Sequence, residues 1–473
     1  MNSNICEVVS SAHNKDKINV NGYLMVKDKN RKFTYYWRCE KYKSLQCLGR
    51  ATTLLIEGQH HLQKFSEHNH AAEASCVNVV KIIKVLKDQA QQTNDQPVQI
   101  IQNIVANSSQ EIFPYLPSRD ALRQSIKRIR HSDDSPAEPQ SLENLIIPEH
   151  MKKTLDGSNF LIKDSTINDN RILIFTTIAN INQLEQSTLW IMDGTFKTVP
   201  TIFKQLYTIH GFVGRNENSW IMPLVYVLMS SKSEECYQAL FQDLIDFGNE
   251  HDIDLHPQFV LTDFEIAAIK AIRTEFPGVQ NKGCHFHLSQ NIYRKVQEFG
   301  LTVLYGTDEN FSLLIRHIPA LAFLPYNEIP TVFDELRNIM PEEANRIMEW
   351  FEIYYIRGRV RHTTRSGNVI QSEPLFPPSL WSIVDNIEHS FPRTQNNVEA
   401  WYRRWETLVG HAHVGVFKII KEIQKEQNRV QLEMESILRG SLRNLPKKKD
   451  RERESRIQRV YDDRDNRPVL DFL

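Results

Sequence analysis

The sequence predicts a mixed α/β protein that begins with a small β-rich module, and two patterns support this fold class. Residues 20–70 contain short runs of β-branched and aromatic residues broken by polar turns, such as "KFTYYWRC" and "GRATTLLIEG". From about residue 160, apolar strand-like segments alternate with helical segments. Such an order of segments builds a mixed sheet that is covered by helices.

The segments of the α/β part follow one another in a definite order. Successive strands are expected at "RILIFTT", "TLWIMDG", "QLYTIHGFV" and "SWIMPLVYVLMS". A helix follows at "SEECYQALFQDLIDFGNEH", then the strand "QFVLTDF", the helix "EIAAIKAIRTEF" and the segment "GVQNKGCHFHL". This is a strand meander followed by a strand–helix–strand unit, so the predicted sheet is mixed.

The remaining segments divide the chain further. Residues 76–141 read as a helical connector that ends in the polar linker "HSDDSPAEPQS". Residues 285–365 have helical patterns with few strand signals, and 366–379 read as a long loop. Residues 440–473 form a charged tail that we expect to be partly disordered.

Composition excludes several classes of protein. The chain has 473 residues and a net charge of −1, and no apolar run is long enough to cross a membrane. Six cysteines are too few for a disulfide scaffold, and the N-terminus lacks an apolar core of signal-peptide length. A cytosolic or nuclear protein is therefore expected. Residues 22–70 and 439–467 each carry a net charge of +5, which suits a polyanionic partner as well as a solvated surface.

A metal site is predicted near the N-terminus. The spacing Cys39-x7-Cys47-x20-His68-x-His70 supplies two thiolates and two imidazoles, which complete a tetrahedral zinc shell. A module of about 50 residues buries little core, so a structural zinc would supply stability. The alternative is two buried cysteines and two surface histidines.

Two aspartates follow apolar strands, and each position needs a reason. Asp193 ends "LWIMD" and Asp263 ends "FVLTD". Asp193 is also compatible with an Asp-Gly turn, and Asp263 with a cap on the helix near Ile266. Because the carboxyl ends of strands in an α/β sheet are where sites are built, the two aspartates together favour a site.

The N-terminal segment resembles the FLYWCH-type zinc finger over about residues 15–72. The aromatic residues Phe33, Tyr36 and Trp37 lead into Cys39, and the ligand spacing agrees. The resemblance implies a β-rich zinc module that binds either DNA or a protein partner. Basic residues near the predicted ligands are the candidate phosphate contacts, namely Lys41, Lys43 and Arg50.

Blocks in residues 110–425 resemble the Mutator-like (MULE) family of DDE transposases. They include "WIMDGTFKTVPTIFKQLYTIHGFV", "FVLTDFEIAAIKAIRTEFPGVQNKGCHFHLSQNIYRKV" and "PRTQNNVEAWYRRW". The resemblance implies an RNase H-like domain over 160–425 with a helical insertion at 285–395. The family's catalytic acids fall on Asp193, Asp263 and Glu399, although sequence spacing alone cannot place Glu399 near the others.

Three carboxylates suit catalysis by Mg²⁺ or Mn²⁺, because these hard cations prefer oxygen ligands. Two such ions activate a nucleophilic oxygen and stabilise a leaving oxygen in phosphodiester cleavage and strand transfer. We expect Gly194 to let the backbone turn close to the site.

The block "GCHFHL" places Cys284 and His287 in a C-x2-H spacing that the family also shows. Three readings stay open at this stage: a second zinc half-site, a DNA contact, or core packing. Two ligands do not close a zinc site. His285 carries a weaker signal than either neighbour.

The expected function is a nuclear, DNA-binding transposase that uses structural zinc and catalytic Mg²⁺ or Mn²⁺. Its expected partners are element ends and target DNA, with a homo-oligomer left open and no membrane. The alternatives are a transposase-derived, non-catalytic DNA-binding regulator and a protein-interaction adaptor. The intact set of acids favours the enzyme.

Overall fold

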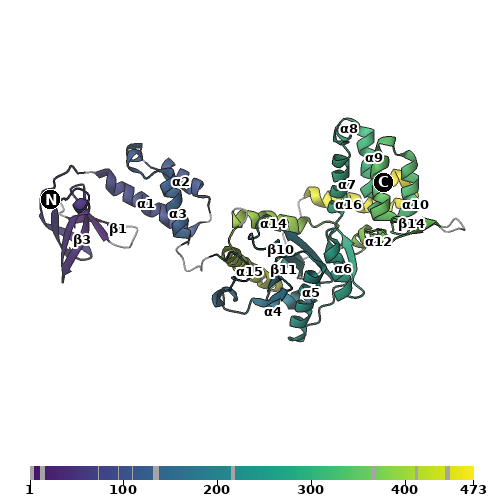
Figure 1. Ribbon diagram of the computed structural model, residues 1–473, viewed down its shortest axis with the longest axis horizontal. Helices are drawn as coiled ribbons and strands as arrows, with labels where there is room; N and C mark the ends of the chain where they lie inside the picture. Colours follow the sequence, from purple (N-terminus) through teal and green to yellow (C-terminus); the bar gives the residue numbers. More distant parts are fainter. Residues whose placement is uncertain are drawn as a thin grey trace. The chain divides into compact units, whose positions relative to one another are not determined.

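The computed structural model describes residues 5–10, 16–72, 74–93, 95–108, 110–131, 138–214, 219–363, 369–410, 414–442 and 448–473. The chain divides into two compact units, Met1–Ala137 and Glu138–Leu473. The division falls within the polar segment 131–141. Figure 1 labels the elements of both units.

The first unit begins with a closed six-stranded barrel. Its strands are β1 (Ile5–Ser10), β2 (Asp16–Val20), β3 (Tyr23–Arg31), β4 (Thr34–Cys39), β5 (Arg50–Ile56) and β6 (Gln59–Phe65). Each strand pairs with the next in antiparallel fashion, and pairing of β1 with β6 closes the barrel. The sequence predicts the last four strands. It does not predict β1 and β2, which are short and begin before the β-rich region recognised over residues 20–70. Trp37, Met25 and Ile18 fill the barrel core.

Three helices complete the first unit: α1 (Ala74–Gln92), α2 (Pro97–Ala106) and α3 (Arg119–His131). Each packs against the other two. Their shared core contains Leu86 and Ala90 of α1, three isoleucines of α2, and Leu122 and Ile126 of α3. The predicted helical connector is therefore a folded helical unit with its own core.

The second unit is built on a seven-stranded mixed sheet with the order β13-β12-β9-β10-β11-β8-β7. The strands are β7 (Leu161–Ile167), β8 (Asn170–Phe175), β9 (Leu189–Thr195), β10 (Gln205–Val213), β11 (Trp220–Met229), β12 (Phe259–Thr262) and β13 (Gln280–Gly283). Strands β7 to β11 pair in antiparallel fashion, while β9, β12 and β13 run parallel. The mixed α/β class predicted from the sequence is confirmed.

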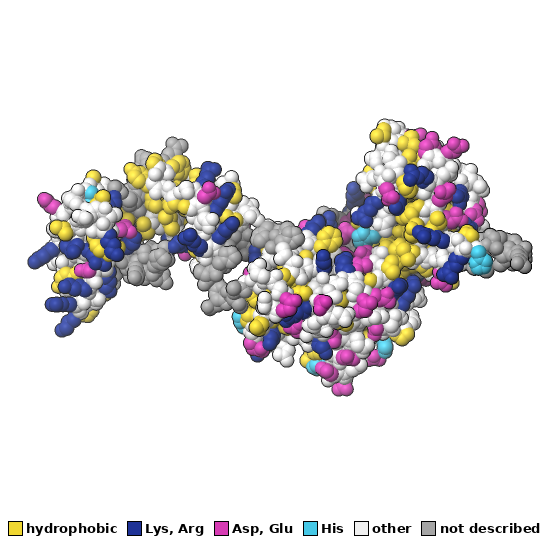
Figure 2. Space-filling model, in the orientation of Figure 1, with side chains coloured by type: hydrophobic (Ala, Val, Ile, Leu, Met, Phe, Trp, Pro, Cys, Tyr) yellow, Lys and Arg dark blue, Asp and Glu magenta, His cyan; other side chains and the backbone are white. Residues whose placement is uncertain are grey.

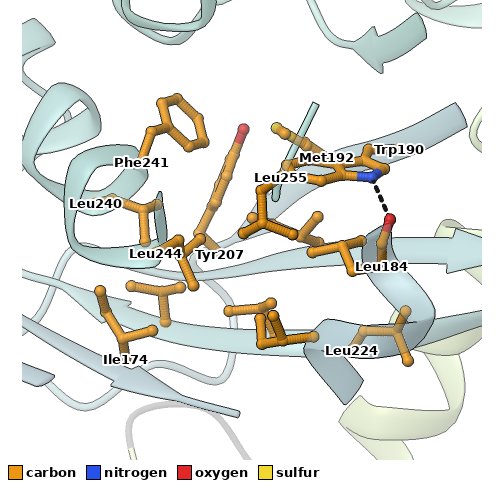
Figure 3. Packing of buried hydrophobic residues seen from close by; sticks show 14 of the residues in the cluster. Ile174, Leu184, Trp190, Met192, Tyr207, Leu224, Leu240, Phe241, Leu244 and Leu255 are labelled. Carbon is orange, nitrogen blue, oxygen red and sulfur yellow. Dashed lines mark hydrogen bonds between the residues drawn. The ribbon is translucent and has the colours of Figure 1, made fainter. Parts of the chain in front are cut away.

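Helices cover both faces of this sheet because its strands are apolar on both sides. The core on one face contains Trp190 and Met192 of β9 and residues of α4 (Ile178–Glu185), α5 (Glu234–Asn249) and α6 (Ile266–Glu275). Figure 3 shows this packing, with the Trp190 indole N–H donating a 2.9 Å hydrogen bond to the carbonyl of Leu184. The core on the other face contains Leu189 and Ile191 with α14 (Asn396–Val409) and α15 (Val416–Leu438).

Residues after β13 form a mainly helical lobe with its own core, inserted between β13 and α14. It contains α7 (His285–Glu298), α8 (Thr302–Thr307), α9 (Glu309–Ala320), α10 (Ile329–Ile339), α11 (Asn345–Phe351), α12 (Pro378–Trp381), α13 (Val384–Glu388) and the hairpin β14 (Val360–Thr363) and β15 (Val369–Gln371). The segment 366–379, expected to be a long loop, contains the short strand β15, and α12 begins at its end with Pro378. Residues 364–368 lie outside the described residues.

In the charged tail, expected to be partly disordered, residues 443–447 lie outside the described residues and residues 448–473 are largely helical. These residues form α16 (Lys448–Asp462) and α17 (Val469–Phe472). Phe472 is buried in the core of the helical lobe, and Val460 and Leu473 pack against it. A few apolar side chains at helical spacing therefore anchor a segment that is otherwise highly charged. None of the described helices is long and apolar enough to cross a lipid bilayer.

Candidate functional site

Four cysteine and histidine side chains converge at one end of the barrel. Cys39 ends β4, Cys47 lies in the loop before β5, and His68 and His70 follow β6. One potential ligand atom from each residue lies within 4.8 Å of the others. The Cys39 sulfur is 3.2 Å from Nε2 of His70, and the Cys47 sulfur is 3.3 Å from Nδ1 of His68. The structure thus brings together all four residues predicted from the spacing.

The surroundings of this quartet fit a structural zinc ion. Nδ1 of His70 lies 2.9 Å from the carbonyl of Ala71, which can only accept a hydrogen bond, so Nε2 is left for a metal. The backbone N–H groups of Lys41 and Gly49 donate to the sulfurs of Cys39 and Cys47 at 3.3 and 3.4 Å. Two thiolates and two imidazoles are an ordinary zinc shell, so the cluster supports structural zinc.

The two aspartates lie at neighbouring strands of the sheet in the second unit. Strands β9 and β12 run parallel, with Leu261 beside Ile191. Asp193 comes two residues after Ile191 within β9, and Asp263 comes two residues after Leu261, directly beyond the end of β12. Both side chains are half-buried. The structure therefore places them at the same edge of the sheet, as expected for the carboxyl ends of parallel strands.

Neither aspartate has the local structural role that the sequence offered as an alternative, a turn for Asp193 and a helix cap for Asp263. Asp193 lies within β9 and not in an Asp-Gly turn. The expectation that Gly194 turns the backbone was also wrong, because it continues the strand. Its lack of a side chain matters for another reason: a Cβ there would lie 2.4 Å from Oε1 of Gln205. Asp263 accepts a hydrogen bond from the Glu265 N–H, but Glu265 is the N-cap of α6.

Helix α14 brings Glu399 toward these aspartates. The side-chain N–H of Gln395, the residue directly before α14, donates to the carbonyl of Met192 at 2.8 Å. A longer contact of 3.4 Å reaches the carbonyl of Leu261. Glu399 lies one turn later, and its N–H donates to the Gln395 carbonyl at 2.9 Å. Glu399 is thus held near the ends of β9 and β12, although 136 positions separate it from Asp263 in the sequence.

The electrostatics of the site agree with the proximity of the acids. Burial raises the pKa of Asp193 to about 7, and the negative charges of Asp263 and Glu399 add to this effect. Burial raises the pKa of Asp263 to about 6, with a further contribution from the charge of Glu265. Lys232 acts in the opposite direction on both aspartates. The site therefore concentrates negative charge that a bound cation would relieve.

The carboxylates are not gathered as tightly as the cysteine and histidine quartet. Within the described part of the chain, that quartet is the one group of His, Cys, Asp and Glu side chains whose potential ligand atoms converge closely. The backbone places Asp193, Asp263 and Glu399 close enough for the charges of the last two to raise the pKa of Asp193. Side-chain rotation or a bound cation would have to draw their oxygens together.

Comparison with protein-family models gives two matches. Residues 189–291 match the MULE transposase domain, and residues 8–70 match the FLYWCH zinc finger domain. The chain carries both domains. A comparison with curated proteins finds no match. The family resemblances seen in the sequence are therefore confirmed.

The two matched ranges divide the candidate residues between them. The FLYWCH zinc finger domain contains Cys39, Cys47, His68 and His70. The MULE transposase domain contains the two aspartates, together with the segment from β13 into α7. Glu399 lies beyond the matched range, so its connection with the aspartates comes from the geometry of α14 alone.

Cys284 and His287 of the MULE transposase domain lie beside the start of α14. The Cys284 sulfur is buried and accepts the Gln395 backbone N–H at 3.4 Å, and burial raises the pKa of its thiol to about 11. Nδ1 of His287 is buried without a hydrogen-bond partner in the structure. No further metal ligands converge on this pair among the described residues. His285 points elsewhere, with Nε2 lying 3.2 Å from the carbonyl of Pro319.

A polar cluster beside the aspartates was missed in the sequence. Glu265 accepts hydrogen bonds of 2.8 Å from both Lys232 and the Tyr237 hydroxyl. The Gln205 side-chain N–H donates to the Tyr237 oxygen at 2.7 Å. The only local sequence signal for this cluster was Glu265 itself, an acid two residues after Asp263. That signal does not reveal that Lys232 and Tyr237 are its partners.

A second contact to the site was also missed. The hydroxyl of Tyr402 in α14 donates to the main-chain carbonyl of Asp193 at 2.7 Å. Its oxygen also lies 3.0 Å from the Thr208 hydroxyl, which in turn lies 3.0 Å from Nε2 of buried His210. The spacing of Tyr402 three residues after Glu399 places both on neighbouring turns of one helix, a signal that could have been used.

The candidate phosphate contacts of the FLYWCH zinc finger domain surround the quartet. Lys41 and Lys43 lie just after Cys39, and Arg50 begins β5 after Gly49. Lys43 and Arg50 are exposed, whereas Lys41 is half-buried. Their role as DNA contacts stays a prediction.

Proposed function

We propose that this protein is a DNA transposase that cuts and joins phosphodiester bonds at Asp193, Asp263 and Glu399. The observation that carries the proposal is that Asp193 and Asp263 lie at neighbouring parallel strands of the sheet, with the charge of Glu399 close enough to act on Asp193. The FLYWCH zinc finger domain would bind DNA, including element ends and target DNA. Chromosomal DNA as the substrate implies action in the nucleus.

The sheet topology supports an RNase H-like fold for the catalytic part. Strands β9, β10 and β11 form an antiparallel meander, and β12 and β13 add in parallel next to β9. The first aspartate lies on the first strand of this meander and the second directly follows the first added strand. Ligand sites in mixed α/β sheets form at such carboxyl ends.

The donor chemistry fits Mg²⁺ or Mn²⁺. The three side chains offer carboxylate oxygens, and the raised pKa values of Asp193 and Asp263 indicate that their negative charges lack sufficient compensation. When bound, such cations stabilise the attacking and leaving oxygens of a phosphodiester. The protein's own contribution is to hold these carboxylates through β9, β12 and α14.

Gln395 and Tyr402 are the proposed positioning residues. Gln395 ties the first turn of α14 to the backbone before Asp193, and Tyr402 ties the next turn to the carbonyl of Asp193 itself. Together they fix the helix that carries Glu399 relative to β9. Such support is needed because a displacement of about 1 Å is enough to impair a catalytic constellation.

Cleavage of duplex DNA that carries the terminal sequences flanking the coding region tests the proposal. Full-length wild type, Glu399→Gln and the surface control Glu298→Gln are compared with Mg²⁺ and with Mn²⁺. We expect cleavage by wild type and by the control, and its loss in Glu399→Gln. DNA binding without cleavage by wild type would overturn the catalytic proposal and favour a non-catalytic DNA-binding regulator.

A further inference from the structure

We propose that the helical unit α1–α3 is a second element that binds duplex DNA, with α3 lying against the DNA. The inference rests on the proposed DNA-directed function, but it assigns a ligand to a segment outside both matched domains. The unit has its own apolar core, so it is a folded surface and not a flexible connector.

Helix α3 has two chemically distinct sides. Leu122 and Ile126 are buried in the core of the unit, and Ile129 packs against it. Outside this buried face, α3 carries four exposed basic residues, namely Arg119, Arg123, Lys127 and Arg128. The first three follow one another at intervals of four residues, so they form a stripe along one face. Figure 2 shows Lys and Arg side chains gathered over this part of the first unit.

The charges of α3 are mostly uncompensated. Arg123 forms a 3.3 Å ion pair with Asp120, a carboxylate whose side chain is 88% exposed. Among the described residues, the other basic side chains of the stripe form no ion pair. A helix whose charges serve solubility mixes both signs. Helix α16 does so, because Lys448 pairs with Glu452, and Glu454 pairs with Arg393.

The distribution of charge over the chain agrees with this interpretation. Residues 1–137 contain 19 Lys and Arg against 13 Asp and Glu, a net charge of +6. The remaining residues contain 38 and 45, a net charge of −7. By net charge the first unit is therefore the one that attracts the phosphate backbone, although residues 439–467 of the second unit also carry a net charge of +5. A 13-residue helix of about 20 Å is also of a size that the major groove admits.

The helical unit is joined to the FLYWCH zinc finger domain through α1. Val77 at the start of this helix packs with Val9 and Leu24 of the barrel, while Leu86 lies in the helical core. Lys81 forms an ion pair with Glu7 of β1. Because α1 packs against the barrel and also belongs to the helical core, DNA contact by one part raises the effective concentration of DNA at the other.

The test is equilibrium binding of the full-length protein to a fluorescent 30-base-pair duplex of random sequence, measured by anisotropy at several salt concentrations. The variant Arg119→Gln/Arg123→Gln/Lys127→Gln removes the stripe with a residue of similar helix propensity. The variant Arg439→Gln/Lys448→Gln/Arg451→Gln removes the same charge from the exposed end of α15 and from α16. Circular dichroism checks that each variant remains folded.

We expect the α3 variant to bind about tenfold more weakly or worse, and its salt slope to fall by about 2 to 3, since each phosphate contact contributes about 0.9. The charge-matched control should retain most of the affinity. Equal binding by wild type and the α3 variant, or equal losses in both variants, would overturn this inference alone. Wild type that binds DNA through α3 but never cuts it would instead refute only the catalytic proposal.

Discussion

The side chain of Gln395 donates a 2.8 Å hydrogen bond to the main-chain carbonyl of Met192, the residue that precedes Asp193. This contact joins the start of α14 to β9 across 203 positions of sequence. Because Glu399 lies one turn further along α14, the contact sets the position of the third acid relative to the first. The side chain also approaches the carbonyl of Leu261 in β12, so it spans the two strands that lead into the aspartates.

Replacement of this amide tests its positioning role. We expect Gln395→Met to lower the turnover rate of DNA cleavage by about 10- to 100-fold, because α14 loses its anchor to β9. The Kd for DNA should stay unchanged, since Gln395 is buried. Asn397→Ala, at an exposed position of the same helix, is the matched control. A Gln395→Met protein with wild-type turnover would show that the anchor is unnecessary.

Substitution of Gly194 tests how closely the polar cluster of Gln205, Tyr237 and Glu265 approaches β9. A Cβ at this position would lie 2.4 Å from Gln205 Oε1, so Gly194→Ala must displace the side chain that donates to Tyr237. We expect a loss of about 1–3 kcal/mol in the free energy of unfolding, measured with urea. Gly306→Ala is the control, because a Cβ at that position would meet no atom within 4 Å. An equal effect at both positions would contradict the close approach.

The fold could be predicted from the sequence where apolar periodicity is strong. Strands β8 to β12 coincide with the expected apolar runs, since residues buried on both faces leave a continuous signal. The hairpin β14–β15 was missed because its strands are short and lie in a polar region. The helical tail was missed because only a few apolar residues, such as Phe472, fix it to the lobe.

The candidate site was predictable only as separate residues. Asp193 and Asp263 each follow an apolar strand, and the quartet of Cys39 has a regular spacing. The contacts that join these elements depend on tertiary packing. Gln395, Tyr402 and Lys232 come from different segments, and none has a local pattern that reveals its partner.

The zinc centre predicts a local dependence of stability on metal. We expect Cys39→Ser to lose the bound zinc and to unfold the barrel, because a small module with a limited core depends on its metal. Zinc content falls by about one ion per chain, measured by atomic absorption, while residues 138–473 keep their resistance to protease. The exposed Ser44→Ala variant in the same loop serves as the control. Normal zinc content in Cys39→Ser would show that the quartet is not the zinc site.

His210 predicts how stability changes with pH. Burial lowers its pKa to about 3, so the folded protein keeps the imidazole neutral where an unfolded histidine takes up a proton. The folded state therefore binds fewer protons between about pH 6.5 and 3, and its stability falls as the pH decreases through this range. From pH 7 to 5 this one group should cost about 2 kcal/mol.

Urea unfolding of the second unit at pH 7 and pH 5, followed by tryptophan fluorescence, measures this loss. The change between the two pH values should be about 2 kcal/mol smaller in His210→Gln than in wild type, whatever the absolute stability of the variant. Six of the seven tryptophans lie after residue 138, so the signal reports mainly on this unit. His256→Gln, at an exposed histidine paired with Asp254, should retain the wild-type change. If His210→Gln also retains it, another group causes the acid sensitivity.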